Sequence, residues 1–116
     1  MNSCSICSDF SHFLETNSYK QLGNAIWMHL HSIATYYPST PTLQEQHNMT
    51  HLIYNIAYFL PCKKCSKHFL EYIQHTPPNV ISNTTLILWM CQFHNNVNQM
   101  LNKPEFDCNT LNVTFT

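Results

Sequence analysis

The residues best suited to chemistry in this sequence are its six cysteines. In chain order they are Cys4, Cys7, Cys62, Cys65, Cys91 and Cys108. The first four form two C-x-x-C pairs, and two such pairs can supply the four thiolates of a structural zinc site. A C-x-x-C pair can also form and break a disulfide bridge in thiol–disulfide exchange. The spacing of the cysteines therefore allows both a zinc site and a redox site.

The surroundings of Cys62 favour redox chemistry. Zinc-binding pairs usually lie in glycine-containing knuckles, whereas Cys62 follows Pro61 at the start of a predicted helix. The unpaired N–H groups and the positive dipole end at a helix N-terminus stabilise a thiolate. Positive charge is added beside the same pair by Lys63, Lys64 and Lys67. We therefore expect thiol–disulfide exchange, with a zinc-binding interaction module as the alternative.

A redox pair also needs an acceptor for its electrons. A thioredoxin-like relay places the C-x-x-C in a βαβ unit, which this sequence does not offer. The single glycine, Gly23, and the lack of long alternating apolar stretches argue against a sheet. In an all-helical protein the natural acceptor is a bound cofactor.

Apolar residues at three- and four-residue intervals predict four amphipathic helices. These are expected to run from Gly23 to Tyr37, from a capping box of Thr42 and Glu45 to Pro61, from near Cys62 to the break at Pro77, and from a Ser82 cap to Pro104. The apolar stripe of the second helix is expected to contain Leu52, Ile53, Ile56, Phe59 and Leu60. Four such helices on short connectors form a bundle, and the tail after Asp107 has room for one further helical turn.

The fourth predicted helix carries polar residues on the face that should be buried. On or beside this face lie Met90, Cys91, His94, Asn95, Val97, Asn98 and Leu101. Unpaired polar groups in a core cost about 1–3 kcal/mol each, so these side chains need partners. Trp27 and His31, on successive turns of the first helix, offer a ring and a polar group to the same slot. The slot suits a planar aromatic ligand, although spacing alone equally allows a core whose polar groups satisfy one another.

Length and charge restrict the classes of function. The chain has 116 residues, a charged fraction of 9% and a formal net charge of −1, and every basic residue is a lysine. We therefore expect no nucleic-acid binding. No apolar run approaches about 20 residues, so we expect no membrane span, and the N-terminus predicts no standard export signal. Residues 1–18 are expected to form a flexible arm that carries the first C-x-x-C, followed by one folded domain over residues 19–116.

Three blocks of the sequence have fixed spacings beyond the cysteines. Residues 23–38 contain G-N-A-I-W, L-H and A-T-Y-Y-P, and residues 59–69 contain F-L-P-C-K-K-C with H-F just beyond. Residues 89–108 contain W-M-C-Q-F-H-N-N-V-N, followed by K-P and F-D-C. These blocks resemble the Erv/ALR family of FAD-linked sulfhydryl oxidases from about Tyr19 to Cys108, and the resemblance leaves the zinc alternative little weight.

The resemblance implies a four-helix bundle that cradles FAD, with a short additional C-terminal helical turn. It implies that Cys65 is the flavin-proximal thiol, that Cys62 meets the substrate, and that Cys91 and Cys108 form a structural disulfide. No metal ion is expected. The positions expected to contact FAD are Lys20, Gly23, Asn24, Trp27, His31, Phe59, Cys91, His94, Asn95, Val97, Asn98, Leu101, Lys103 and Phe115.

The implied activity is the oxidation of thiols in substrate proteins to disulfides. Electrons would pass from the Cys62 and Cys65 pair to FAD and then to molecular oxygen, which becomes hydrogen peroxide. Cys4 and Cys7 are expected to act as a shuttle pair, and family members usually form homodimers through their first two helices. The implied location is the host cytoplasm or virion if the chain is viral, and the mitochondrial intermembrane space if it is cellular.

The sequence departs from the family pattern at charged positions. Asn24 stands where the family has an arginine, and Phe115 lies where an Arg-Trp pair often follows the last cysteine. Without arginine, Lys20, Lys103 and histidine side chains must meet the FAD pyrophosphate, and Phe115 is the candidate to cover the adenine. The two lysines inside the redox pair favour acidic substrates, since relatives often have acidic or neutral residues there.

Overall fold

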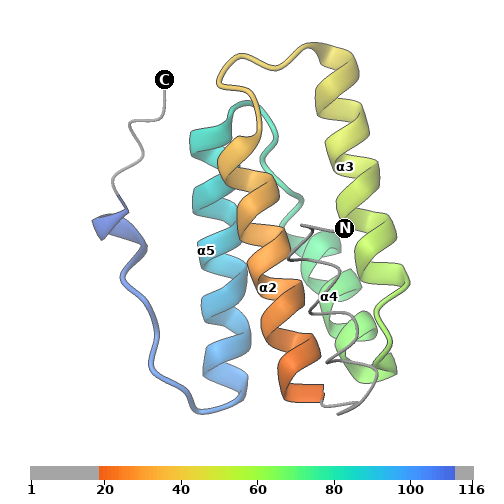
Figure 1. Ribbon diagram of the computed structural model, residues 1–116, viewed down its shortest axis with the longest axis vertical. Helices are drawn as coiled ribbons and strands as arrows, with labels where there is room; N and C mark the ends of the chain where they lie inside the picture. The colour runs from red at the N-terminus through yellow and green to blue at the C-terminus, as the bar shows by residue number, and fades with distance from the viewer. Residues whose placement is uncertain (1–18, 112–116) are drawn as a thin grey trace, which may run out of the picture. The chain divides into compact units, whose positions relative to one another are not determined.

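A computed structural model describes residues 19–111 of the chain. They form the helices α2 (Tyr19–Tyr36), α3 (Leu43–Tyr58), α4 (Lys63–His75) and α5 (Asn83–Met100) and the 3-10 turn η1 (Cys108–Thr110) (Figure 1). This part of the chain contains no strand. The predicted all-α class, with its additional C-terminal helical turn, is therefore confirmed.

The chain divides into two compact units, and the boundary falls within α2 between Ser32 and Ile33. The arm that was expected over residues 1–18, with Cys4 and Cys7, lies outside the described residues, as does Phe115. Across residues 19–111, no helix combines the length and the apolar character that a membrane crossing requires.

The predicted helix starts are present where a capping residue marks them. Thr42 and Glu45 form the capping box of α3, in which the Glu45 N–H donates to Thr42 Oγ1 at 3.0 Å and the Thr42 N–H donates to Glu45 Oε1 at 2.9 Å. Ser82 caps α5, where its side chain accepts a hydrogen bond from the Thr85 N–H. Such side-chain acceptors satisfy N–H groups that the helix itself leaves unpaired.

Two details differ from the sequence-based prediction. α2 begins at Tyr19, one turn before the predicted start at Gly23. The prediction missed this turn because no apolar periodicity in the sequence marks it. In α3 the fully buried positions are Ile53 and Ala57, whereas Phe59 is 75% exposed. Phe59 is the C-cap, so it lies past the last turn whose side chains face the core.

Aromatic rings join α4 to α5. Phe69 of α4 stacks on Phe93 of α5 with ring centroids 4.2 Å apart, and Tyr72 meets Trp89 edge to face at 5.8 Å. The Trp89 indole N–H donates to the Thr76 carbonyl at 2.9 Å, so this buried polar atom has a partner. Such ring pairs contribute about 0.5–1.5 kcal/mol beyond the area they bury. This cluster fixes the two helices side by side.

The chain reverses direction after α5 through a left-handed residue. Asn102 has φ of 56°, and the Lys103 N–H donates to the Asn98 carbonyl at 2.8 Å while the Asn102 N–H donates to the Gln99 carbonyl at 3.2 Å. This is the Schellman arrangement, with asparagine at the position that glycine usually occupies. The segment that follows, residues 103–111, runs back along α5 (Figure 1).

The left-handed turn provides a stability test. We expect Asn102→Ala to lower the free energy of unfolding by about 1 kcal/mol, because an L side chain without a local hydrogen-bonding group is disfavoured at positive φ. Asn102→Gly is the matched control and should leave the stability unchanged or slightly raised. Urea unfolding followed by circular dichroism measures both, and equal destabilisation by the two variants would contradict the explanation.

Candidate functional site

The Cys62 and Cys65 pair lies where α4 begins. Cys62 is the N-cap, it forms a disulfide with Cys65 across a Cα–Cα distance of 5.2 Å, and its Sγ accepts a hydrogen bond from the Cys65 N–H at 3.3 Å. Cys65 is exposed and Cys62 partly exposed. The first turn of α4 holds no acidic residue to offset the positive end of the helix. A thiolate released here by reduction is therefore stabilised by the helix terminus and accessible to other thiols.

One turn further, α4 contacts α5 through His68. The His68 Nε2 lies 2.8 Å from the Asn96 Oδ1, and the His68 ring stacks on Phe93 with centroids 6.4 Å apart. The amide oxygen can only accept, so Nε2 carries the hydrogen. Neither His68 nor Asn96 was predicted to have a role. The sequence signals that could have indicated them are the His68-Phe69 dipeptide after the redox pair and the place of Asn96 in the W-M-C-Q-F-H-N-N-V-N block.

The predicted residues of α5 share one side of this helix. Cys91 is 6% exposed, His94, Asn95, Val97 and Asn98 are partly exposed, and Leu101 is 55% exposed. Their sequence intervals of three and four residues place them on adjacent turns of one face. Exposure therefore increases from the disulfide end of this face to its C-terminal end.

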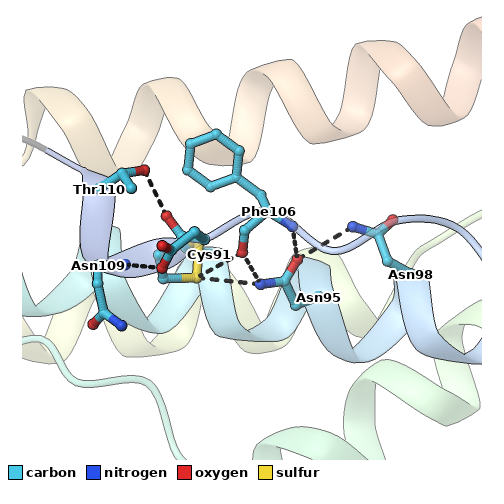
Figure 2. The surroundings of a disulfide bond; sticks show 8 residues. Cys91, Asn95, Asn98, Phe106, Asn109 and Thr110 are labelled. Atoms are coloured by element: carbon cyan, nitrogen blue, oxygen red, sulfur yellow. Dashed lines mark hydrogen bonds between the residues drawn. A yellow bond between two sulfur atoms is a disulfide. The ribbon is translucent and has the colours of Figure 1, made fainter.

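Asn95 has a structural role on this face. Its Nδ2 donates to the Phe106 carbonyl at 2.6 Å and its Oδ1 accepts from the Phe106 N–H at 2.8 Å (Figure 2). The same amide also donates to the Cys108 Sγ at 3.3 Å and accepts from the Asn98 side chain at 3.4 Å. The Asn95 amide thus holds the returning segment to α5, which is a different use from the predicted contact with a cofactor.

A second disulfide fixes the same segment. Cys91 of α5 is bonded to Cys108 at the start of η1, with a Cα–Cα distance of 6.0 Å (Figure 2). Closing a loop with this sequence separation of 17 residues contributes about 3 kcal/mol in the chain-entropy model. Cys91 is buried, unlike Cys65, so solvent and substrate thiols have much less access to this bond. The two disulfides therefore suit different roles.

The predicted residues of the first unit form a stripe along α2. Lys20, Asn24, Trp27 and His31 recur at four- and three-residue intervals, with Gly23 beside them. The Trp27 and His31 rings stack with centroids 5.8 Å apart, and both residues are partly exposed. Burial lowers the pKa of His31, so its imidazole is neutral at neutral pH. A neutral imidazole can donate and accept hydrogen bonds, but it brings no positive charge to a phosphate.

Gly23 lies inside α2 at a position that does not require glycine. A Cβ atom built there meets no atom of residues 19–111 within 4 Å, and the φ of Gly23 is not positive. Glycine inside a helix costs about 0.5–1 kcal/mol relative to alanine. A group that binds closely against this part of α2 would explain why glycine is present here in spite of its lower helix propensity.

The remaining predicted positions are widely spread. Phe59 follows the last turn of α3 and pairs edge to face with Tyr58, with ring centroids 4.9 Å apart. Lys103 is exposed at the turn after α5. Within residues 19–111, no three histidine, cysteine or acidic side chains are grouped so that they could hold a metal ion.

An accessible C-x-x-C disulfide at a helix start, a second, buried disulfide and an all-helical fold define a thiol–disulfide redox protein. The sequence pattern of the Erv1 / Alr family matches residues 24–116. The mitochondrial FAD-linked sulfhydryl oxidase ERV1 of Saccharomyces cerevisiae is 43% identical over 90 residues, which cover 78% of this chain and 48% of that protein. The chain belongs to the Erv1 / Alr family.

Two further comparisons agree with this assignment. The crystal structure of the FAD binding domain of Erv1 from Saccharomyces cerevisiae matches with a TM-score of 0.78 and 42% identity, over 79% of this chain and 88% of that one. A putative FAD-linked sulfhydryl oxidase of Invertebrate iridescent virus 3 is 38% identical over 94 residues, which cover 79% of this chain and 64% of that protein. The chain thus spans about half to two thirds of the length of these curated relatives.

The lowered pKa of His31 predicts a pH-dependent stability. The unfolded chain binds a proton at His31 near the ordinary histidine pKa of 6.5, whereas burial lowers this pKa, so the folded chain binds the proton only at lower pH. Stability therefore falls as the pH drops below about 6.5, because protons then favour the unfolded state. We expect His31→Gln to lose less stability than the wild type between pH 7 and pH 5 in thermal melts of the cofactor-free protein. Parallel pH profiles would contradict the burial of this imidazole.

Proposed function

We propose that the chain is an FAD-dependent sulfhydryl oxidase that forms disulfides in substrate proteins. The observation that carries this proposal is the accessible disulfide at the start of α4, in a member of the Erv1 / Alr family. A thiolate, either of the substrate or of a Cys4 and Cys7 pair that the substrate has reduced, attacks the Cys62 Sγ, and the Cys65 thiolate leaves. The second thiol of the attacking pair then resolves the mixed disulfide, which leaves that pair oxidised and Cys62 and Cys65 reduced. FAD, when bound, would supply the acceptor for the two electrons of the reduced pair. Molecular oxygen would be the final acceptor and would become hydrogen peroxide.

The described residues fit FAD. The ring of Trp27 and the neutral His31 imidazole offer stacking and hydrogen bonding, and Gly23 leaves open space for close approach along α2. In the second unit, considered by itself, His94 and Asn98 are the partly exposed polar residues of the α5 face that we assign to FAD. Because His31 is neutral, Lys20 and Lys103 are the residues we assign to the pyrophosphate.

The partners follow from the same proposal. They are substrate proteins with thiol pairs, molecular oxygen and a second copy of the chain. We also propose Cys4 and Cys7, which lie outside the described residues, as a shuttle pair that passes substrate electrons to Cys62. The yeast relative is a mitochondrial protein and another relative is viral, so a mitochondrial location and a viral origin each have a counterpart among the relatives.

The Cys65→Ser variant tests the proposed chemistry. We expect oxygen consumption with dithiothreitol to be lost while the visible flavin absorption is retained, because removal of one sulfur leaves α4 and α5 packed through their rings. Cys108→Ser is the control for loss of a sulfur outside the redox pair, because it breaks the bond to Cys91, and it should keep turnover at a lowered melting temperature. Full turnover of Cys65→Ser would refute the assignment, and a colourless protein with stoichiometric zinc would favour the zinc alternative.

Gly23→Ala tests the position of the cofactor. In the cofactor-free protein we expect this variant to be more stable by about 0.5–1 kcal/mol, because alanine is the better helix former and its Cβ meets open space. In the presence of FAD the gain should shrink or reverse, because the added methyl group hinders close approach. Thermal melts with and without FAD measure both quantities. A stabilisation that is equal in the two states would show that FAD does not approach Gly23.

A further inference from the structure

A groove lies next to the redox disulfide, between the end of α3 and one face of α4. It has a volume of about 410 Å³, and the residues that define it are Tyr58, Leu60, Lys63, Ser66, Lys67 and Leu70. We call it the lysine groove. It opens to solvent, and a volume of this size is enough for several side chains of a bound segment.

The lining residues Leu60 and Lys63 lie on either side of Cys62 in the chain. Ser66 also lines the groove, and the Ser66 N–H donates to the Cys62 carbonyl at 2.9 Å. Cys65 lies two residues from both Lys63 and Lys67, which turns it to the opposite side of α4. Neither cysteine is among the described lining residues, but because Cys65 is turned away, Cys62 at the N-cap is the nearer of the two to the groove. It is also the one that the proposed function assigns to the substrate.

The charge of the groove is positive near the disulfide. Lys63 and Lys67 line it, Lys64 lies beside them, and the first turn of α4 has no acidic residue. Among the lining residues in the described part of the chain, Glu71 alone is acidic, and it lies nine residues after Cys62, about two and a half turns along α4, at the far end. The helix N-terminus adds to the positive potential at the near end.

The apolar part of the groove comes from Leu60, Leu70 and the 65% exposed ring of Tyr58. Lys63 and Lys67 are about 6 Å apart along the helix axis, close to the length of two residues of extended chain. An extended segment with acidic side chains two residues apart would therefore match both lysines.

Resting on the proposed function, we propose that the lysine groove docks an acidic, extended segment of the substrate and presents its cysteine pair to Cys62. The segment carries acidic residues beside the cysteines and at least one apolar residue for Leu60 and Leu70. Glu71 opposes a basic residue further along. The groove thus selects among thiol proteins, whereas small neutral dithiols need only Cys62.

The test uses the FAD-loaded protein and three reduced peptides with one C-x-x-C sequence, flanked by acidic, neutral or basic residues. Each oxidation rate is divided by the dithiothreitol rate of the same enzyme preparation. We expect the acidic peptide to react about tenfold faster than the basic one at low ionic strength, and the ratio to fall towards one as salt screens the charges. Equal rates for the acidic and basic peptides would overturn the proposal. Absence of dithiothreitol turnover would overturn the proposed function instead.

Two variants of opposite sign make the test specific. Lys67→Glu should reduce or invert the preference for the acidic peptide, and the matched Glu71→Gln should increase it. Both side chains are exposed, and circular dichroism checks that each variant folds. Binding of cysteine-free fluorescent peptides, measured by anisotropy, should follow the same order and needs no turnover. If Lys67→Glu changes the sedimentation of the enzyme and not its peptide preference, a second copy of the chain occupies the groove and the proposal is wrong.

Discussion

The stack of Phe69 on Phe93 is the contact on which the site depends. It lies one turn after the redox pair on α4 and directly before His94 on α5, so it fixes the disulfide relative to the α5 face. Removing a buried aromatic ring typically lowers the free energy of unfolding by about 3–5 kcal/mol. Here the loss would also allow α4 and α5 to shift relative to each other. Electron transfer from a thiolate needs its acceptor at a fixed distance, and small errors of position are costly. The same ring pair therefore both stabilises the packing of α4 on α5 and sets the geometry of the site.

Much of this arrangement could be predicted from the sequence because it is local. The caps at Thr42 and Ser82, the stop at Pro61 and the position of Cys62 at a helix start each depend on a few consecutive residues. Local hydrogen bonds of this kind are set by residue type and spacing. The same locality made it predictable that the redox pair meets the positive end of α4.

The parts that the sequence did not predict are tertiary. The bonds from Asn95 to Phe106 require the chain to reverse at Asn102 and return along α5, and no periodicity within α5 indicates that return. In the sequence, nothing distinguishes Asn95 from other polar residues on a helix face, because its partner Phe106 is brought to it only by the tertiary fold. Phe59 was expected in an apolar stripe, but an apolar pattern does not show where a helix stops burying its side chains.

The two disulfides show how one chain separates reactive from inert sulfur. A protein with the proposed activity has to exchange one of its own bridges at every turnover and keep the other intact, although both contain the same bond. Exchange depends on access to the attacked sulfur and on the stability of the thiolate that leaves. Cys62 and Cys65 have both, because they lie at an open helix start, whereas Cys91 is buried in the body of α5. The bond to Cys108 is covered further by the Asn95 amide. Position within a helix, rather than any difference in the cysteines, therefore makes the Cys62–Cys65 bridge the one suited to exchange and the Cys91–Cys108 bridge the protected one.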